Sequence, residues 1–290
     1  MKDMGIEIKN VDFFYDDNLI TPHQSLFDIN LSIKEGEIIG IAGKTGSGKS
    51  TLAEVIAGLS RPSRGQVTVD GVDIYGVRNR EESRLAREAK RKIGMVFQYA
   101  EYQLFEETVE RDIAFAPKEM MFSKKTVEER VNRAMELVGL NKNMKNRPPY
   151  NLSGGEKRRV AIAGILAFSP KYLILDEPMV GLDAKGQRDI LNLMLKLNRE
   201  ENSTILFISH SMENIAEIAH KMIVMKDGRL IVADSVYNVF SDKELLKTAG
   251  LKRPKIWEFL DRLKSCGIDI ESDALSEEEG VNRIVSAVNG

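Results

Sequence analysis

The chain has 290 residues, which is enough for one large domain and an appendage. Its composition, 42% hydrophobic and 30% charged, is typical of a globular protein, and the formal net charge of −2 argues against a general nucleic-acid binder. Cys266 is the single cysteine, which excludes an internal disulfide and a cysteine metal site. No apolar run approaches the ~20 residues that span a bilayer, so a membrane role would require a partner.

The N-terminal part of the chain reads as strands. Apolar and polar residues alternate over residues 27–33 and 66–70, and residues 11–15 form a third stretch. These pieces predict a small antiparallel sheet. Tyr15 ends the stretch of residues 11–15, and its ring could stack on an adenine or simply pack within the strand. Sequence alone leaves these two roles equally open.

A glycine-rich run between an apolar strand and a helix predicts a phosphate-binding loop. The strand is residues 38–42 and the helix begins near residue 52. The loop reads Gly43-Lys44-Thr45-Gly46-Ser47-Gly48-Lys49-Ser50-Thr51. Its glycines let backbone N–H groups face a polyphosphate, Lys49 would reach the β- and γ-phosphates, and the Ser50 hydroxyl would bind Mg²⁺. A plain turn explains the run poorly, because it needs no lysine and serine after the last glycine.

Four nearly continuous apolar runs predict the strands of a buried parallel sheet. They are residues 38–42, 93–97, 172–175 and 205–208. Each run ends in polar residues: the glycine loop, Gln98, Asp176-Glu177 and Ser209-His210. Ligands bind beyond the carboxyl ends of strands in open α/β sheets, so we expect these residues to meet at one site.

The chemistry of these side chains suggests roles in hydrolysis of a phosphoanhydride. Asp176 can hold Mg²⁺, and Glu177 can orient and polarise the attacking water. Gln98 offers a donor and an acceptor to water or metal, and His210 can donate to the γ-phosphate. Taken singly, a glutamine or a histidine is more often structural, and that interpretation is kept for the other two histidines, His23 and His220.

A second glycine pair follows at Ser153-Gly154-Gly155-Glu156. Ser153 and Glu156 fit a capping box that opens a helix over residues 157–168. Each glycine in the first turn costs about 1 kcal/mol relative to alanine, which capping alone does not explain. The glycines leave the helix N–H groups open to an anion, so this stretch is a second candidate phosphate-binding surface.

Six motifs occur in the order and spacing of the ATP-binding cassette (ABC) ATPases, and the chain resembles that family over roughly residues 5–232. The motifs are Gly43 to Thr51, Gln98, Leu152 to Glu156, Leu173 to Glu177, Gly181-Leu182-Asp183 and His210. The resemblance implies an ATPase in which Lys49, Gln98, Glu177 and His210 are catalytic. It also implies that Ser50, Gln98 and Asp176 bind Mg²⁺ and that Asp183 contacts nucleotide.

The same resemblance implies a head-to-tail dimer. The Ser153-Gly154-Gly155 surface of one protomer would close over ATP held by Lys49 of the other. Two departures stand out: Glu156 replaces the more usual glutamine, and Met179-Val180 replaces small or polar residues. Neither removes a catalytic group, although Glu156 adds negative charge near the facing nucleotide.

A narrower resemblance is to the energy-coupling factor (ECF) transporter ATPases of the cobalt- and vitamin-uptake type. It rests on residues 98–109, residues 157–164 and the tail 235–290. It implies a second, related ATPase or a second copy, a membrane-embedded coupling protein, and a separate substrate-capture protein. Glutamates and aromatic residues mix in 101–110, which would suit a basic amphipathic helix of the coupling protein; the alternative is a solvated helical face.

The sequence therefore predicts an α/β P-loop NTPase: a RecA-like parallel core sheet, an antiparallel β subdomain and an inserted α-helical subdomain at about 99–165. The nucleotide-binding domain would span 1–232, and a helical extension over 233–290 would serve dimerisation, with Trp257 either packing or joining two ATPases. The predicted function is the ATPase of an ECF-type importer at the cytoplasmic membrane face. The alternatives are the ATPase of a conventional binding-protein-dependent importer, an ABC machine acting on DNA or ribosomes, and a phosphotransferase kinase.

Overall fold

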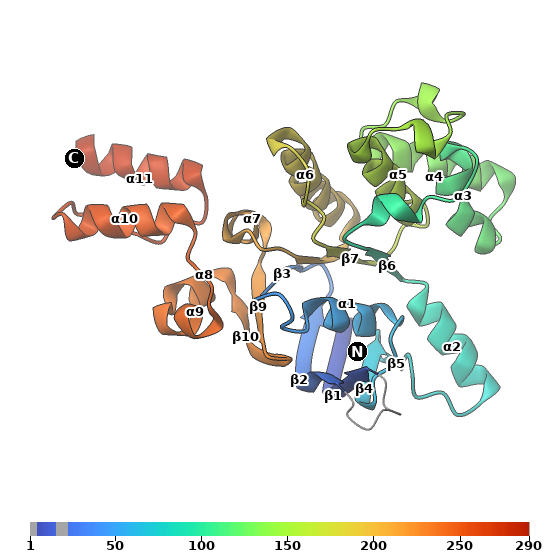
Figure 1. Cartoon of the computed structure of the whole chain (residues 1–290), viewed down its shortest axis with the longest axis horizontal. Coiled ribbons are helices and arrows are strands. Elements are labelled where there is room, and N and C mark those ends of the chain that lie inside the picture. The colour runs from blue at the N-terminus through green and yellow to red at the C-terminus, as the bar shows by residue number, and fades with distance from the viewer. Residues whose placement is uncertain (1–4, 16–22, 290) are drawn as a thin grey trace.

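The structure is a computed structural model of the chain and describes residues 5–15 and 23–289. Residues 1–4 and 16–22 of the predicted nucleotide-binding domain, and residue 290 of the predicted C-terminal extension, lie outside the described part. Figure 1 shows a central sheet, a lower antiparallel sheet, a helical region at the upper right and a helical extension at the left. The α/β P-loop fold predicted from the sequence is confirmed.

The core sheet contains the four predicted apolar strands side by side. Its described strands are paired in the order β10-β9-β3-β8-β7-β6, parallel except for β10. The strands are β3 (Ile38–Ala42), β6 (Ile93–Val96), β7 (Tyr172–Asp176), β8 (Thr204–Ile208), β9 (Lys221–Lys226) and β10 (Arg229–Ser235). The parallel strands therefore end at the same edge of the sheet.

The apolar runs are continuous because both faces of the core sheet are covered. Along β8, Ile205 and Phe207 join one hydrophobic cluster, whereas Leu206 and Ile208 join the other. Helices α5, α6 and α7 contribute to the first cluster, and α1 with the antiparallel sheet contributes to the second. The edge that carries the loops is thus held rigidly from both sides.

The antiparallel sheet packs under α1 (Figure 1). Its described strands are paired in the order β2-β1-β4-β5. They are β1 (Gly5–Tyr15), β2 (His23–Lys34), β4 (Arg64–Val69) and β5 (Val72–Asp73). The three strands predicted from alternation lie within β1, β2 and β4, so this sheet is confirmed.

The helices complete the molecule. They are α1 (Lys49–Ala57), α2 (Arg80–Lys90), α3 (Val109–Glu119), α4 (Lys124–Leu137), α5 (Gly154–Leu166), α6 (Ala184–Glu201), α7 (Met212–Ile218), α8 (Val236–Ser241), α9 (Lys243–Ala249), α10 (Lys255–Ser265) and α11 (Glu277–Asn289). Short 3-10 turns are η1 (Ala100–Gln103), η2 (Lys142–Met144) and η3 (Pro149–Asn151). Helices α3, α4 and α5 follow β6 and precede β7 in the sequence, and they pack against one another in the region predicted to be helical.

The C-terminal helices extend away from the core (Figure 1). Trp257 on α10 is only 1% exposed and lies between the rings of Tyr237 and Phe240, with the Arg253 guanidinium 4.3 Å from its ring centre. A side chain buried this deeply in its own unit packs that unit and does not reach a second ATPase. The idea that Trp257 itself joins two subunits is therefore wrong. The division of the chain at residue 233 and a dimerisation role for the extension stay predictions.

Candidate nucleotide-binding site

The glycine loop leaves β3 at Ala42 and enters α1 at Lys49. Gly48, the N-cap of α1, has a φ of 96°, and a Cβ there would lie 2.9 Å from the carbonyl oxygen of Ser25. Only glycine fits that position without strain. At Gly46, by contrast, a Cβ would meet no described atom within 4 Å, because that part of the loop faces open space. The loop thus has the open, N–H-lined shape that a phosphate chain requires.

Lys49 is buried under this loop. Its Nζ donates to the carbonyl oxygens of Gly43 at 2.9 Å and Lys44 at 3.0 Å. Burial lowers the pKa of Lys49, whereas the carboxylates of Glu177 and Asp176 raise it. The ammonium is therefore held in place before a ligand arrives, and an anionic phosphate would supply the charge partner that the carbonyls lack.

A cavity of about 350 Å³ opens at this edge of the sheet. It is lined by residues of β1 and β2, by loop residues and by residues at the ends of three core strands: Tyr15, His23, Ser25, Thr45, Gly46, Gly48, Lys49, Ser50, Thr51, Gln98, Asp176, Glu177, Ile208 and His210. The four strand ends thus meet at one site, as the sequence pattern predicted. Gly43 and Lys44 line a neighbouring hollow, and Ser47 is buried beneath the loop.

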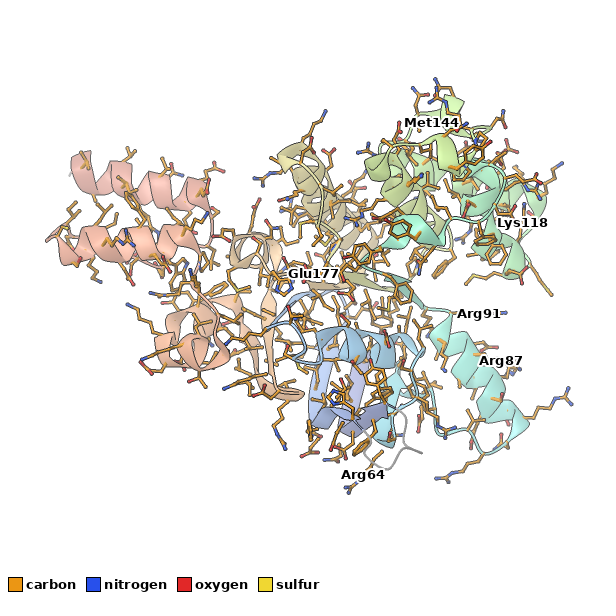
Figure 2. All side chains as sticks on the ribbon, in the orientation of Figure 1. Arg64, Arg87, Arg91, Lys118, Met144 and Glu177 are labelled. Carbon is orange, nitrogen blue, oxygen red and sulfur yellow. The ribbon has the colours of Figure 1, made fainter. Side chains whose placement is uncertain are left out.

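Glu177 lies at the centre of the molecule in Figure 2. Its φ of 48° is in the left-handed region, which is uncommon for a non-glycine residue and frequent at functional sites. Burial and the neighbouring Asp176 raise the pKa of Glu177 to about 7, against the opposing effect of Lys49. A carboxyl group with such a pKa can accept a proton from water near neutral pH.

His210 Nε2 lies 3.0 Å from Glu177 Oε1, although the approach lacks hydrogen-bond geometry. Burial and then Lys49 lower the pKa of His210, while Asp176 raises it. Because the ordinary pKa of histidine is 6.5 and that of His210 is lower, the imidazole is mostly neutral above pH 6.5. It can then donate one hydrogen bond towards the cavity.

Asp176 and Ser50 also line the cavity and offer it oxygen atoms. Burial raises the pKa of Asp176 above its ordinary value, although a hydrogen bond from Ser50 and the charges of Lys49 and His210 oppose this rise. Gln98 also lines the cavity. Hydroxyl, carboxylate and amide oxygens are the ligands that Mg²⁺ prefers.

This donor set fits Mg²⁺ that arrives with a nucleotide. Buried Glu177 Oε1 has no hydrogen-bond partner among the described residues, which leaves it available to a water molecule. The described residues contain no group of three or more His, Cys, Asp or Glu side chains that could hold a metal alone. Mg²⁺ commonly takes one or two carboxylates and completes its shell with phosphate oxygens and water.

The second glycine surface lies elsewhere in the chain. The predicted capping box is present: Ser153 N and Oγ donate to Glu156 Oε2 at 2.8 Å, and Glu156 N donates to Ser153 Oγ at 3.3 Å. These bonds hold the pKa of Glu156 below its usual range. A Cβ at Gly154 or Gly155 would meet no described atom within 4 Å, so this helix start is open.

Within one chain, Ser153 to Glu156 are not among the described residues that line the loop cavity, and neither is Asp183. Asp183 caps α6 by accepting from Gly186 N at 2.8 Å. The fold thus brings together the loop, Gln98, Asp176, Glu177 and His210, and it leaves the second surface facing outwards. The roles of these residues in nucleotide binding stay predictions.

Sequence reasoning missed three residues of the cavity, His23, Ser25 and Ile208. Sequence alone assigns His23 a structural role, whereas the pairing of β1 with β2 places it opposite Tyr15 at the cavity. Ser25 contacts Thr51 Oγ1 at 3.0 Å, beside the Tyr15 hydroxyl at 2.9 Å from the same oxygen. No local pattern marks His23 and Ser25, because only the pairing of β1 with β2 brings them there, whereas Ile208 ends a predicted core strand. His220 is structural as interpreted: its Nδ1 accepts from Ile38 N.

Tyr15 fits both of its predicted roles. Its ring packs edge-on against Phe13, with the ring centres 4.9 Å apart, yet 42% of the residue remains exposed at the cavity. The exposed ring is available for stacking, and the packed edge keeps it in place.

The segment after Gln98 differs from the expected acidic groove. Arg111 pairs with Glu106 at 3.1 Å and with Glu107 at 2.5 Å, and Lys145 pairs with Glu110 at 3.1 Å. These pairs neutralise much of the negative charge. Aromatic exposure is the stronger feature of the segment: Tyr102 is 83% exposed, and Tyr99, Phe105 and Phe115 are also exposed.

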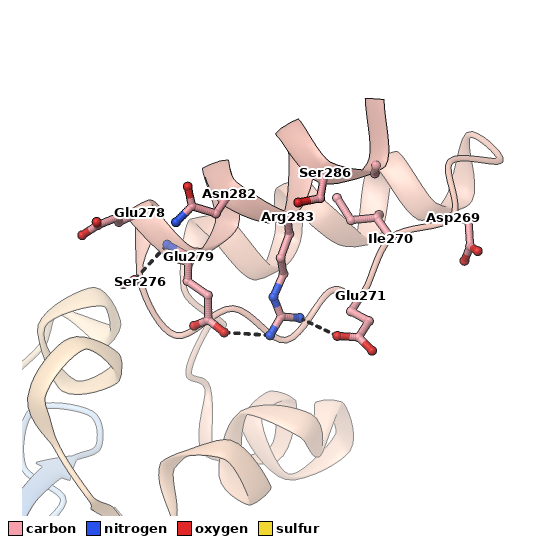
Figure 3. Close-up of a pocket in the computed structure, with 10 residues that line it drawn as sticks. Asp269, Ile270, Glu271, Ser276, Glu278, Glu279, Asn282, Arg283 and Ser286 are labelled. Atoms are coloured by element: carbon pink, nitrogen blue, oxygen red, sulfur yellow. Dashed lines mark hydrogen bonds and ion pairs between the residues drawn. The ribbon is translucent and has the colours of Figure 1, made fainter. Parts of the chain in front are cut away.

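A separate hollow of about 620 Å³ lies beside α11 in the C-terminal extension. Figure 3 shows Arg283 crossing it between Glu279 and Glu271, and Asp273 completes the set of carboxylates around this arginine. The described residues that line it include none from the glycine loop. Arg283 pairs with all three of these carboxylates, so we assign the cluster a structural role in holding α11 against the loop that precedes it.

Comparison with known proteins agrees with this geometry. The family model described as "ABC transporter" matches residues 26–180. Proteins named energy-coupling factor transporter ATP-binding protein EcfA2 are similar over nearly the whole chain. The one from Caldanaerobacter subterraneus is 43% identical over 99% of both chains, and the one from Clostridium acetobutylicum is 44% identical over 97% of both.

Solved structures give the same result. The cbiO1 protein of Clostridium perfringens, described as part of the ABC transporter complex cbiONQ, is 33% identical with a TM-score of 0.72, over 89% of this chain and 99% of that one. A dimeric ATP-binding cassette bound to ADP and Pi is 29% identical with a TM-score of 0.70, over 80% of this chain and 98% of that one.

Fold and site thus define a P-loop ATPase of the ATP-binding cassette class. Within that class, the chain belongs to the energy-coupling factor transporter ATP-binding proteins. No helix in residues 5–15 and 23–289 combines the length and apolarity needed to cross a membrane.

Proposed function

We propose that this chain is the ATP-hydrolysing subunit of an ECF-type importer. The observation that carries the proposal is the meeting of Lys49, Gln98, Asp176, Glu177 and His210 at one sheet edge, beside a glycine loop open to a phosphate chain. The near-full-length similarity to ECF transporter ATP-binding proteins supports it.

Each residue has a defined task in this proposal. Lys49 and the loop N–H groups bind the phosphates, and the exposed face of Tyr15 stacks on the base. Glu177 orients a water molecule and accepts its proton, while neutral His210 donates to the γ-phosphate. Ser50, Asp176 and Gln98 hold Mg²⁺, which supplies charge neutralisation to the phosphates when bound. Most of the catalysis is positioning and electrostatics, as expected for phosphoryl transfer.

A second cassette completes the site. In one chain the Ser153 to Gly155 surface faces outwards, away from the loop cavity, and nothing described fills the space next to its glycines. Head-to-tail pairing brings that surface over the ATP of the partner, where its helix N–H groups meet the γ-phosphate. Leu182 and Gly186, on either side of Asp183 at the start of α6, line one hollow together with Gly155, so Asp183 lies near the same surface. The partner is a paralogous ATPase or a second copy of this chain.

Glu177→Gln tests the ATPase assignment. Glutamine keeps the shape of Glu177 but cannot accept the proton, so we expect ATP binding to persist and turnover to fall about 10²- to 10⁴-fold. The measurement is phosphate release by the transporter complex in detergent, with ATP binding followed on the same sample. Glu244→Gln, at an exposed position on α9, is the control. Turnover like that of the wild type in Glu177→Gln would refute the assignment of the base.

In this proposal the membrane partner docks on the exposed aromatic residues around η1, beside the ion pairs that Glu106 and Glu107 make with Arg111. Reversing Glu106 and Glu107 to lysine is expected to weaken recovery of the chain with membranes. The adjacent exposed pair Glu128 and Glu129 on α4, changed to lysine in the same way, is the matched control. Unchanged membrane recovery of the Glu106/Glu107 variant would remove this segment as the docking site.

The transported substrate, a vitamin or a metal ion, would be captured by a separate membrane protein and would not contact this chain. The chain would then sit peripherally at the cytoplasmic face of the membrane. Co-purification from membranes in mild detergent, followed by identification of the bound proteins, tests both points.

A further inference from the structure

Arg158 is a buried cation that none of the roles above uses. It lies on α5, two residues after the glycine-opened turn, and only 5% of it is exposed. Its guanidinium donates to the Glu101 carboxylate from Nε and Nη2 at 3.2–3.3 Å, and from Nη2 to the Gln98 carbonyl oxygen at 2.8 Å. From Nη1 it donates to the carbonyl oxygens of Pro178 at 3.4 Å and of Val180.

These contacts satisfy the whole guanidinium. A buried charge is tolerated only when it is paired and its donors are bonded, and Arg158 has both a carboxylate and three carbonyl acceptors. The planar fork of arginine, with five N–H donors, can reach acceptors on different sides at once. A lysine ammonium at the same place is a point charge and cannot span all of them.

The partners of Arg158 belong to segments that carry the proposed chemistry. Gln98 lies between β6 and η1 and Glu101 lies within η1, both in the segment proposed to meet the membrane partner. Pro178 and Val180 directly follow Glu177 and precede Asp183. Arg158 itself belongs to the helix whose first turn carries Ser153 to Gly155. One side chain thus ties its own helix to two stretches that contain acceptors 20 and 60 residues away from Arg158 in sequence.

We propose that Arg158 is a positioning residue for ATP hydrolysis: it holds the Gln98 backbone and the loop after Glu177 in register, and it transmits displacement of η1 to that loop. The inference rests on the proposed ATPase function. It differs from a purely structural role in one respect: loss of the link should disturb Gln98 and Glu177 together, without loosening the rest of the fold.

The kinetic test uses Arg158→Lys and Glu101→Gln, which retain charge at Arg158 and avoid an empty buried site. In the full transporter complex we expect kcat to fall about 10- to 100-fold, while KM for ATP stays within about threefold of the wild-type value, because positioning of the reacting groups is lost and phosphate binding is not. Arg84→Gln, which removes the exposed Arg84–Glu88 pair on α2, is the control and should change neither constant.

The double variant Glu101→Gln with Arg158→Lys supplies the coupling test. Since both changes break the same link, the fall in kcat should be clearly smaller than the product of the two single effects. Multiplying effects would mean that the two residues act independently, and wild-type kcat in folded single variants would overturn the inference.

Amide hydrogen exchange tests the link even if the chain proves not to be an ATPase. In Arg158→Lys, exchange should rise together in peptides covering 98–103 and 178–183, and should remain at wild-type levels in the antiparallel sheet. A rise in only one of the two peptides, or a uniform rise over the chain, would refute the positioning role. If both peptides respond while the wild-type protein shows no turnover, the proposed function fails and the link stands.

Discussion

Asp70 offers a sharp test of how the two sheets are joined. It lies just after β4, is 9% exposed, and has a φ of 50°. Its Oδ2 accepts from Lys92 at 2.6 Å, and its Oδ1 accepts from Lys171 at 2.9 Å and from the Tyr172 hydroxyl at 2.6 Å. Its partners lie at the start of the core strands β6 and β7, so one carboxylate connects the antiparallel sheet to the core sheet.

The expected cost of Asp70→Asn follows from these contacts. Asparagine keeps the shape, tolerates the left-handed backbone and can still accept from Tyr172, but it loses the charge that pairs with two lysines. Breaking a buried pair costs about 3–5 kcal/mol, and we reduce this to about 2–3 kcal/mol because Lys92 and Lys171 are partly exposed to solvent. For a chain of this size that corresponds to a melting temperature lower by about 4–12 °C.

The pH dependence gives the experiment its direction. Burial alone would raise the pKa of Asp70, but hydrogen bonds from Lys92, Tyr172 and Lys171 outweigh it and hold the pKa well below its ordinary value. A depressed pKa contributes stability above the pKa of the unfolded state, about 3.9, and this contribution is lost as the pH falls towards the folded-state value. The difference in stability between the wild type and Asp70→Asn should be at its largest at pH 7 and should become smaller below about pH 4.

The assay is thermal unfolding followed by circular dichroism at pH 7, 5, 4 and 3. Asp227→Asn is the matched control, because Asp227 has a similar φ of 49° but is exposed, so its replacement should change stability little. If Asp70→Asn were as stable as the wild type at pH 7, or if the difference in stability were the same at pH 7 and pH 3, the reasoning would be refuted.

Two further predictions concern the nucleotide. Lys49→Met should abolish the stabilisation by MgATP, which for the wild type at 100 times Kd is about 2.7 kcal/mol, or about 5–10 °C in a thermal shift; a retained shift would contradict the phosphate-binding role of Lys49. Tyr15→Ala should raise the KM for ATP by about 5- to 150-fold if the ring stacks on the base, since such stacking is worth about 1–3 kcal/mol. Tyr15→Phe retains the ring and loses only the hydroxyl contact with Thr51, so it should keep a KM near the wild-type value. A KM near the wild-type value in Tyr15→Ala would instead favour packing as the role of the ring.

Much of the fold could be read from local patterns. The apolar runs 38–42, 93–97, 172–175 and 205–208 all became core strands, because a strand covered on both faces must be apolar throughout. Helix α2 had no such pattern: its buried residues are Ala86 and Ala89 and most of the others are charged, so periodicity did not reveal it.

The sequence by itself also determined the chemistry of the site, because the loop glycines, Lys49 and the polar residues after each strand are local features whose roles follow from residue type and order. Tertiary structure decided which distant residues meet. Pairing of β1 with β2 brought His23 and Ser25 to the cavity, and folding of Arg111 and Lys145 onto the glutamates neutralised a segment that looked acidic in sequence. Arg158 became a buried link for the same reason. Ion pairs and cavity walls depend on three-dimensional distance between residues far apart in the chain, and no local pattern records that distance.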